Sequence, residues 1–306
     1  MPKSVKKGLT LRDRGQTPWY RLAVAAWLTV AASFAQAADA GHYLGALTWP
    51  EAERELASTP VVVLPFAAGA KEHGHHLPMN SDAVMMRFLT DAAVHERDVL
   101  IAPPVLHGWF PAFREYPGTE VADPTVFQNY LQQVAESLVR HGAKRIIFLN
   151  TGIQNATGLP ISIVAREIRA QYGVPTLVVS WDHLETEDAT GLQSQLKGGH
   201  ADEIETAIQL YLQQQAVQMD KATVDYREAN RRSSVGYQPG GFSRQEGHPH
   251  FSAAGNFGDA TLAKAELGGQ VLAVMRRNWF KAIDEFSAVP LAPTAQASKA
   301  NTEAAQ

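Results

Sequence analysis

Residues 61–82 read VVVLPFAAGAKEHGHHLPMNSD, an apolar run followed closely by a cluster of polar residues. The β-branched run Val61–Leu64 is typical of a buried strand in a parallel sheet. The polar cluster then lies at the carboxyl end of this strand, which is where open α/β sheets bind their ligands. This stretch therefore predicts the fold class and the position of a functional site.

The segment Lys71–Asp82 holds three histidines and two carboxylates, interrupted by a glycine and a proline. Imidazole and carboxylate groups together suit a divalent ion such as zinc, manganese or iron. The simpler alternative is that individual histidines bind backbone carbonyls or face solvent. For the cluster as a whole we predict a metal or catalytic site.

Strand and helix patterns alternate along the rest of the chain. Apolar residues at helical spacing, preceded by capping residues such as Thr48 and Asp123, predict helices, and short β-branched runs predict strands. Together they predict an α/β fold with three layers, α/β/α, and a mainly parallel central sheet in a single domain. The predicted helices cover residues 48–56, 81–89, 124–138, 161–172, 208–212 and 260–279, and the predicted strands cover residues 61–64, 99–102, 145–150 and 176–181.

Polar or irregular segments follow several of these elements. Residues 151–155 are expected to form a loop at a strand tip. Residues 108–119, rich in aromatic side chains, form a pocket wall, a subunit contact or a surface loop. Residues 235–258, which include His248 and His250, have the composition of a long loop over one face. Loops of that length in compact domains tend to be functional or mobile.

The run Gly198–Thr206 leads into a predicted helix. Its acidic residues Asp202, Glu203 and Glu205 have a simple explanation as residues of a first helical turn, where the helix dipole favours carboxylates. His200 is not explained in this way. We therefore single it out as a candidate functional residue.

The first 37 residues have the composition of a secretory signal peptide. Six lysines and arginines lie within residues 1–21. An uncharged apolar run follows at residues 22–35, and it is too short to span a bilayer comfortably. Ala35-Gln36-Ala37 resembles a cleavage site, although an uncleaved membrane anchor is the alternative. We expect cleavage near Ala37, a periplasmic or secreted domain at residues 38–288, and a disordered tail at residues 289–306.

Composition excludes several classes of function. Residues 38–306 hold 21 Lys and Arg against 30 Asp and Glu, a formal charge of −9, which argues against a nucleic-acid partner. The chain has no cysteine, so disulfides and thiolate ligands are excluded and any metal ligand must be nitrogen or oxygen. No Gly-x-Ser-x-Gly sequence is present, so a serine nucleophile of that kind is unsupported.

Four separated segments resemble the creatininase (creatinine amidohydrolase) family, in the family's order and over about residues 45–280. The resemblance implies a layered α/β/α fold, hydrolysis of C–N bonds in cyclic or linear amides by two divalent ions, and frequently a homo-hexamer. These segments are Glu72–Pro78 with Asp82, Tyr116–Thr119, His200–Thr206 and Gly258–Ala263.

The resemblance also implies roles for individual residues. His73 and Asp82 match metal ligands of the family, and the aspartate matches the ligand that bridges the two ions. His200 matches a histidine beside the substrate, and Glu205 matches the second acid of a conserved run in the family.

The chain departs from the family pattern at positions that hold metal. Where the family has its first glutamate ligand the chain has Lys71, and Glu72 is displaced by one residue. A histidine and a carboxylate of the family are replaced by Gly152 and Gln154, and another histidine of the family is replaced by Phe113. Two adjacent ions need several anionic ligands, so we predict a single ion, with ligands drawn from Glu72, His73, His76 and Asp82.

We therefore predict a metal-dependent hydrolase of an amide or cyclic amide. The ion would activate water, His200 or Glu205 would move the proton to the leaving nitrogen, and Lys71 would stabilise the oxyanion. Gln154 is a candidate on the substrate side, and so is Glu203, which could also orient an imidazole. The expected partners are a small-molecule amide and further copies of the chain in a homo-oligomer, for which the resemblance implies a hexamer.

Two other hypotheses remain from sequence. The first is a family member that has lost hydrolysis and acts as a periplasmic binding or assembly protein, since ligand positions have changed while the signatures remain. The second is catalysis without metal by Lys71 and Glu72 as a base pair, which would require a depressed lysine pKa.

Overall fold

The computed structural model describes residues 39–152, 154–226, 242–248 and 251–291. The predicted signal peptide, most of the predicted tail and His250 lie outside these residues, so the domain boundaries stay predictions. Among the described residues, no helix combines the length and apolar composition needed to cross a bilayer.

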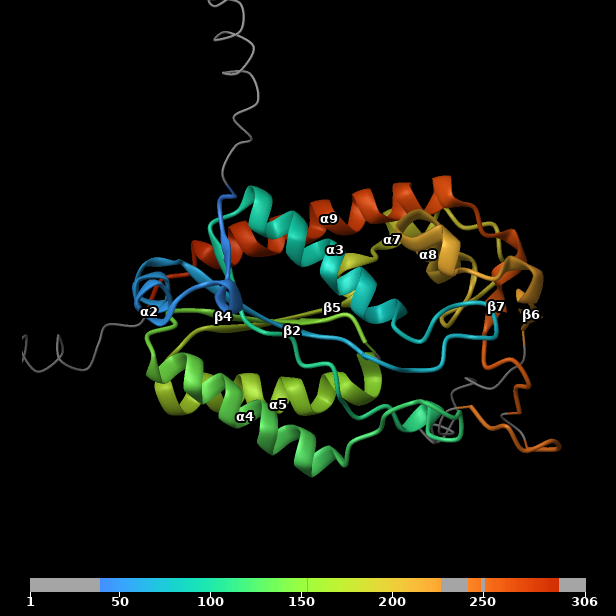
Figure 1. Ribbon diagram of the computed structural model, residues 1–306, viewed down its shortest axis with the longest axis horizontal. Coiled ribbons are helices and arrows are strands. Elements are labelled where there is room, and N and C mark those ends of the chain that lie inside the picture. Colours follow the sequence, from blue (N-terminus) through green and yellow to red (C-terminus); the bar gives the residue numbers. More distant parts are fainter. Residues whose placement is uncertain (1–38, 153, 227–241, 249–250, 292–306) are drawn as a thin grey trace, which may run out of the picture. The chain divides into compact units, whose positions relative to one another are not determined.

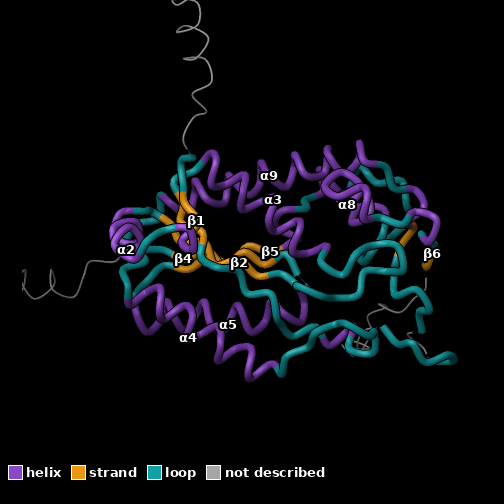
Figure 2. The backbone as a smooth tube through the Cα atoms, viewed as in Figure 1, coloured by secondary structure: helices purple, strands orange, loops and turns teal. Residues whose placement is uncertain are grey.

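A five-stranded parallel sheet forms the centre of the molecule (Figures 1 and 2). The strand order β1-β3-β2-β4-β5 places β2 in the middle, and β2 pairs with β4 from Val62 opposite Ile146 to Phe66 opposite Asn150. All strands therefore end at the same edge, as predicted for this fold class. The strands are β1 (His42–Tyr43), β2 (Val61–Phe66), β3 (Val99–Ile101), β4 (Ile146–Asn150) and β5 (Thr176–Ser180).

The central strand β2 is buried on both faces, which explains its continuous apolar sequence. Val61 and Val63 belong to one apolar core, and Val62 and Leu64 belong to another. Because side chains alternate across a strand, this single run of valines contributes to the core on each side of the sheet. Burying one such side chain is worth about 1.5–3 kcal/mol.

Helices cover both faces of the sheet, which confirms the predicted three-layer architecture (Figure 1). One outer layer contains α3 and α9, with α8 packed closely against α9. The opposite layer contains α4 and α5. The helices are α2 (Trp49–Ser58), α3 (Ser81–Glu96), α4 (Pro124–Arg140), α5 (Gln154–Tyr172), α6 (Trp181–Leu184), α7 (Glu187–Thr190), α8 (Glu203–Gln213) and α9 (Ala265–Ser287).

Capping side chains begin three helices at the places that the sequence predicts. The Glu51 carboxylate accepts hydrogen bonds from the backbone N–H and hydroxyl of Thr48, at 2.8 and 2.6 Å, before α2. Asp123 accepts from two backbone N–H groups at the start of α4, and Asp202 does the same for α8. Each such cap contributes about 1 kcal/mol to helix stability.

Several predicted boundaries need correction. The helix predicted from residue 161 begins at Gln154, so the expected loop at residues 151–155 is shorter and Pro160 lies inside the helix. The strand predicted to end at Trp181 ends at Ser180, because Trp181 begins α6. The helix predicted at residues 260–279 begins as a single 3₁₀ turn, η6 (Ala260–Leu262), before α9 continues to residue 287.

The apolar face of α4 also differs from prediction. Phe127, Leu131 and Leu138 pack into the core, but Val126 and Tyr130 are exposed. Helical spacing identifies which residues share a face, but it does not fix how wide the buried part of that face is.

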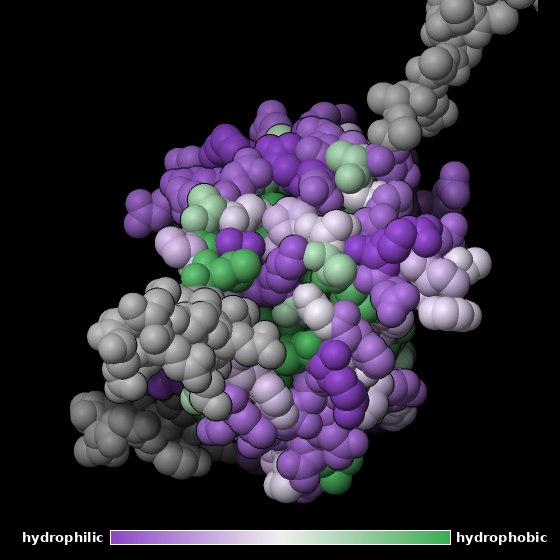
Figure 3. All heavy atoms as spheres, turned by 90° about the vertical axis from the view of Figure 1, so that its left-hand side faces the viewer, coloured by the Kyte–Doolittle hydropathy of each residue, from purple (hydrophilic) through white to green (hydrophobic). Residues whose placement is uncertain are grey.

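Short elements complete the described chain. The pair β6 (Val224–Asp225) and β7 (Gly258–Asp259) is antiparallel and lies near the carboxyl edge of the sheet (Figure 1). The opposite end of the molecule, near α2, has a mainly hydrophilic surface with small apolar areas between (Figure 3). The remaining 3₁₀ turns are η2 (Leu44–Ala46), η3 (Pro111–Phe113), η4 (Gln214–Ala216) and η5 (Met219–Lys221).

Candidate active site

The histidine-rich loop follows β2 and returns to the sheet as α3. The backbone N–H of Lys71 donates to the carbonyl of Met79 at 3.0 Å, which closes the loop at its base. The backbone N–H of Glu72 donates to the Thr119 hydroxyl at 3.0 Å, which ties the loop to the aromatic segment at residues 108–119. The loop therefore places its side chains over the carboxyl edge of the sheet.

The Asp82 carboxylate meets two basic side chains in a buried position. His73 Nε2 lies 2.9 Å from Asp82 Oδ1, and Lys71 Nζ lies 2.9 Å from Asp82 Oδ2. Lys71 is only 2% exposed and Asp82 only 4%. His73 Nδ1 faces the carbonyl of Lys71 at 2.9 Å, so both nitrogens of the ring face acceptors. The predicted convergence of His73 and Asp82 is confirmed, with Lys71 as a third member.

Electrostatics hold Asp82 in its ionised form. Burial alone would raise the pKa of this carboxyl, but the charges of Lys71 and His73 and the hydrogen bond with His73 outweigh burial and hold its pKa well below the usual range. Asp82 Oδ2 has no well-aligned hydrogen-bond donor, although the Lys71 ammonium is in ion-pair contact with it. Attraction between charges therefore stabilises this oxygen more than hydrogen-bond geometry does.

A second charged set contains Glu72, His200 and Glu205. His200 Nε2 lies 3.0 Å from Glu72 Oε2, and His200 Nδ1 lies 3.6 Å from Glu205 Oε2. Burial disfavours the charged imidazole, but the Glu72 carboxylate and its hydrogen bond, with Glu205, raise the pKa of His200. Burial likewise opposes ionised Glu72, yet His200 and the backbone N–H of Gly74 keep the pKa of Glu72 below its usual range.

The two sets are neighbours, because the ring centroids of His73 and His200 lie 5.3 Å apart. The ring of Phe113 packs against the ring of His200, with the two centroids 4.3 Å apart. The ring centroid of Phe242 lies 4.9 Å from that of Phe113. The Lys71 ammonium lies 5.5 Å from the Phe113 ring centroid, within the range of a cation–π contact. From the segment at residues 108–119, Phe113 thus packs against the second charged set, although no residue of the segment lines the pocket beside Asp82.

His76 does not point at the other histidines. Its Nε2 lies 2.7 Å from the Thr206 hydroxyl on α8. Burial lowers the pKa of His76 to about 4, although Glu205 and Glu72 act in the opposite direction, so the ring is neutral at pH 7. The four predicted ligands, Glu72, His73, His76 and Asp82, are therefore not gathered around one point.

The acids at the start of α8 have different roles. Asp202 is the N-cap, and its Oδ2 also accepts from Gln195 Nε2 at 2.7 Å. Glu203 accepts from the backbone N–H groups of Ser194 and Gln195 at 2.7 and 2.6 Å, so it holds the preceding loop and does not face the site. Gln154 begins α5, but the position of its side chain lies outside the described part of the chain.

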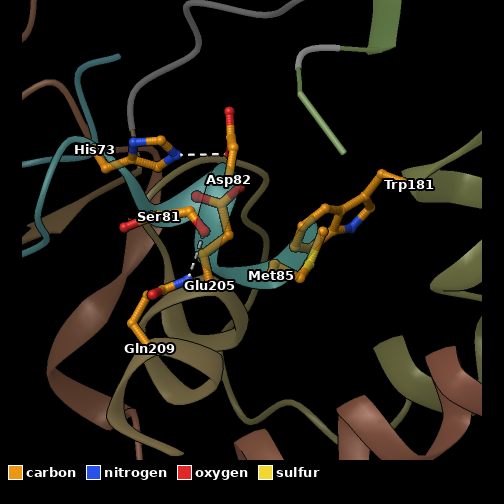
Figure 4. Close-up of a pocket in the computed structure, with 7 residues that line it drawn as sticks. All are labelled: His73, Ser81, Asp82, Met85, Trp181, Glu205 and Gln209. Carbon is orange, nitrogen blue, oxygen red and sulfur yellow. Dashed lines mark hydrogen bonds and ion pairs between the residues drawn. The ribbon is translucent and has the colours of Figure 1, made fainter. Parts of the chain in front are cut away.

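A pocket opens beside Asp82, with an empty volume of about 190 Å³ that includes its opening to solvent (Figure 4). His73 and Asp82 point toward each other at one end, and the Trp181 indole lies beside Met85 at the other. The polar groups His73, Asp82 and Glu205 share the pocket with an apolar wall. The space inside is about 10 Å³, room for about one water molecule. The lining residues are His73, Ser81, Asp82, Met85, Trp181, Glu205 and Gln209.

Sequence reasoning missed several of these residues. Trp181 was predicted as the end of a strand, and Met85 as part of an apolar helix face, yet both line the pocket. Ser81 and Gln209 come from α3 and α8, where Gln209 Nε2 donates to the carbonyl of Ser81 at 3.2 Å. Phe242 is far from the other residues in sequence, and no local pattern marks it. Gln209 is only 3% exposed, and nothing in the sequence indicates that this polar helix residue is buried.

The residues as placed do not fit a divalent ion. Asp82 is engaged by His73 and Lys71, and Glu72 is engaged by His200. Within the described residues, no three His, Asp or Glu side chains converge as the ligands of an ion would. An ion beside Asp82 would also meet the positive charge of Lys71. The ligand roles stay a sequence prediction, and we derive no step of the reaction through an ion.

Glu185 supplies a pH-dependent test of the charge around α8. Burial raises the pKa of Glu185 to about 7, and Asp202 and Glu205 add to it, against the hydrogen bond from Trp181 Nε1. Because the pKa of Glu185 is higher in the folded state than its ordinary value of 4.5, the folded protein binds this proton more tightly than the unfolded chain does. The resulting stabilisation of the fold is present at low pH and is lost as pH rises through 7. We expect Glu185→Gln to exceed the wild type in unfolding free energy by about 2–3 kcal/mol at pH 8 and to match it near pH 5.

Urea unfolding of both proteins at pH 5 and pH 8 measures this difference. Glu187→Gln, an exposed change on α7, is the control and is expected to show no comparable pH dependence. An equal difference between Glu185→Gln and wild type at the two pH values would contradict the raised pKa.

Comparisons with known proteins agree with this architecture. The sequence model of the creatininase family, described as creatinine amidohydrolase, matches residues 45–283. Creatinine amidohydrolase of Pseudomonas putida is 26% identical over 134 residues, which are 42% of this chain and 52% of that protein. The match thus spans about half the length of that relative.

Two further similarities cover more of the fold. Mycofactocin precursor peptide peptidase of Mycolicibacterium smegmatis is 25% identical over 230 residues, covering 72% of this chain and 84% of that protein. The solved structure of a mutant creatininase described as Zn–Zn type is 25% identical with a TM-score of 0.67, covering 81% of this chain and 98% of the other. Another solved creatininase is named with Mn.

Proposed function

The chain belongs to the creatininase family, and from this premise we propose that it hydrolyses the C–N bond of a small non-peptide amide, cyclic or linear. The observation that carries the proposal is the cluster of His73, Asp82 and Glu205 at the carboxyl edge of the sheet, where a space for about one water molecule lies beside an apolar wall. The family activity and the chemistry of this pocket agree. They support an amidohydrolase more strongly than a binding protein.

Glu205 is the group best placed to move a proton. Its side chain lines the pocket and is 17% exposed, while its Oε2 is fixed by the backbone N–H of Ala201 at 2.6 Å. In the proposed reaction Glu205 takes a proton from water as the water oxygen bonds to the amide carbon. The same proton then passes to the nitrogen as the C–N bond breaks, giving a carboxylic acid and an amine.

His200 and Lys71 act from behind the pocket. His200 lies between Glu72 and Glu205 and is 6% exposed, so it orients Glu205 and balances its charge. Lys71 faces Asp82 and is not among the described residues that line the pocket, so a direct contact with an oxyanion stays a prediction. The same burial gives no support to Lys71 and Glu72 as a catalytic base pair open to substrate.

The test is turnover by the purified, untagged protein on three groups of compounds: cyclic amides such as lactams and hydantoins, linear amides, and short peptides. NMR detects the new carboxylate and amine. We expect turnover of at least one non-peptide amide, and a loss in kcat of about 10²–10⁴-fold in Glu205→Gln, the usual worth of a general base.

Glu266→Gln is the matched control, because Glu266 is an exposed residue in the first turn of α9. It is expected to keep the wild-type rate. Turnover of peptides alone would contradict the substrate class, and equal rates for wild type and Glu205→Gln would contradict the assigned base. Specific binding of an amide without any turnover would favour the alternative of a binding protein.

Two finer expectations join the proposal. Export to the periplasm, with cleavage near Ala37, predicts a mature amino terminus at about residue 38 in the periplasmic fraction. Assembly into a homo-oligomer predicts a mass several times that of one chain in light scattering, and six times that mass for the hexamer that the resemblance implies. Solved structures of the family are named with Mn and as Zn–Zn type, which supports a divalent ion for the family. The number and position of ions in this chain stay expectations, because the described residues do not fit an ion at Asp82.

A further inference from the structure

The geometry points to Lys71 as the built-in cation of this site: we infer that its ammonium takes the position of a divalent ion beside Asp82, and that the protein binds no such ion there. This inference goes beyond the proposed reaction, because it concerns how the site balances its charge. Its test needs no turnover.

The first argument is the position of the ammonium. Lys71 Nζ lies 2.9 Å from Asp82 Oδ2, and both side chains are almost fully buried. A charged lysine is rarely buried unless it is paired, because removing its charge from water is costly. The long side chain of Lys71 thus brings one positive charge to the buried carboxylate of Asp82.

The second argument is the balance of charge. Three carboxylates, on Glu72, Asp82 and Glu205, lie within one connected set of contacts. Lys71, His73 and His200 are the basic partners of these carboxylates. A divalent ion beside Asp82 would have to compete with Lys71 and His73 for the oxygens of that carboxylate. The same ion would also be repelled by the ammonium.

The third argument is that the ammonium is held in place by more than Asp82. The backbone N–H of Lys71 is bonded to Met79, its carbonyl faces His73 Nδ1, and its ammonium lies near the Phe113 ring. These contacts fix both ends of the residue. Lys71 therefore acts as a positioning residue, which holds Asp82 and, through it, the ring of His73.

The experiment measures metal content and melting temperature with Mn²⁺ and Zn²⁺ alone. The untagged wild type, dialysed against each ion, is expected to hold no more metal than Asp82→Asn, and its melting temperature is expected to be unchanged by chelator. Any ion retained equally by both proteins is bound elsewhere and agrees with the inference.

Three substitutions at position 71 separate charge from ligand. Lys71→Arg keeps the cation and is expected to remain free of metal. Lys71→Gln removes the charge without adding a strong ligand and is expected to melt at a lower temperature than Lys71→Arg. Lys71→Glu replaces the cation by an anion, and Mn²⁺ or Zn²⁺ at about a hundredfold excess over its Kd is expected to raise its melting temperature by about 5–10 °C.

Two results would overturn the inference. One is about one equivalent of Mn²⁺ or Zn²⁺ in the wild type that is lost in Asp82→Asn. The other is a Lys71→Gln protein as stable as wild type, since an ammonium that can be removed without cost is not the cation that Asp82 needs. If Lys71→Glu does not fold, the wild-type measurement and the Lys71→Gln comparison still decide.

Discussion

Asp82→Ala is expected to lower the free energy of unfolding by about 3–5 kcal/mol, the usual cost of removing one partner from a buried ion pair. The change leaves the Lys71 ammonium buried without its carboxylate, and it also removes the acceptor of His73 Nε2. We expect turnover to be lost as well, because Asp82 lines the pocket. Urea unfolding at pH 7 measures the stability, and circular dichroism reports whether the variant folds.

A second substitution tests the reason for this loss. Lys71→Met combined with Asp82→Ala removes both charges, so the double variant is expected to be more stable than Asp82→Ala alone. Asp188→Ala is the control, because its ion pair with Arg277 is exposed and such pairs contribute about 0–1 kcal/mol. A double variant less stable than Asp82→Ala would show that volume, and not an unpaired charge, causes the loss.

The part of the site that lies near β2 could be predicted from sequence. A run of valines followed by histidines and acids predicted the strand, the position of its carboxyl end and the proximity of His73 to Asp82. This prediction succeeded because His73 and Asp82 are close in sequence, and because the hydrogen bond from Lys71 to Met79 closes the loop between β2 and α3 at its base. The helix caps Thr48 and Asp123 succeeded for the same reason, since a cap depends on contacts within four residues.

The direction of long or isolated side chains could not be predicted in the same way. Sequence left Lys71 as a possible contact of the substrate, whereas its ammonium turns inward to Asp82. It also grouped His76 with His73, although His76 turns to Thr206 on α8, a partner 130 residues away. Both side-chain directions depend on which distant element packs over the loop. Local sequence patterns do not predict that packing.

The packing of α8 against α9 is the other feature on which the site depends, and Gly268→Ala is expected to disrupt it. A Cβ at Gly268 would lie 2.0 Å from the carbonyl oxygen of Ala207 in α8 and 2.8 Å from the backbone N of Ile208. These are backbone atoms, so the helices must separate. We expect a loss of about 2–3 kcal/mol in the free energy of unfolding. Glu205 lies two residues before Ala207, so the proposed turnover is expected to fall with it.

The neighbouring glycine provides the matched control. A Cβ at Gly269 would meet only the ring of Tyr211, whose side chain is 55% exposed and can move. Because alanine has a higher helix propensity than glycine, Gly269→Ala is expected to be neutral or to stabilise the protein by up to about 1 kcal/mol. Thermal and urea unfolding compare the two variants directly. Equal stability of Gly268→Ala and Gly269→Ala would mean that the close approach of α8 to α9 does not determine where Glu205 lies.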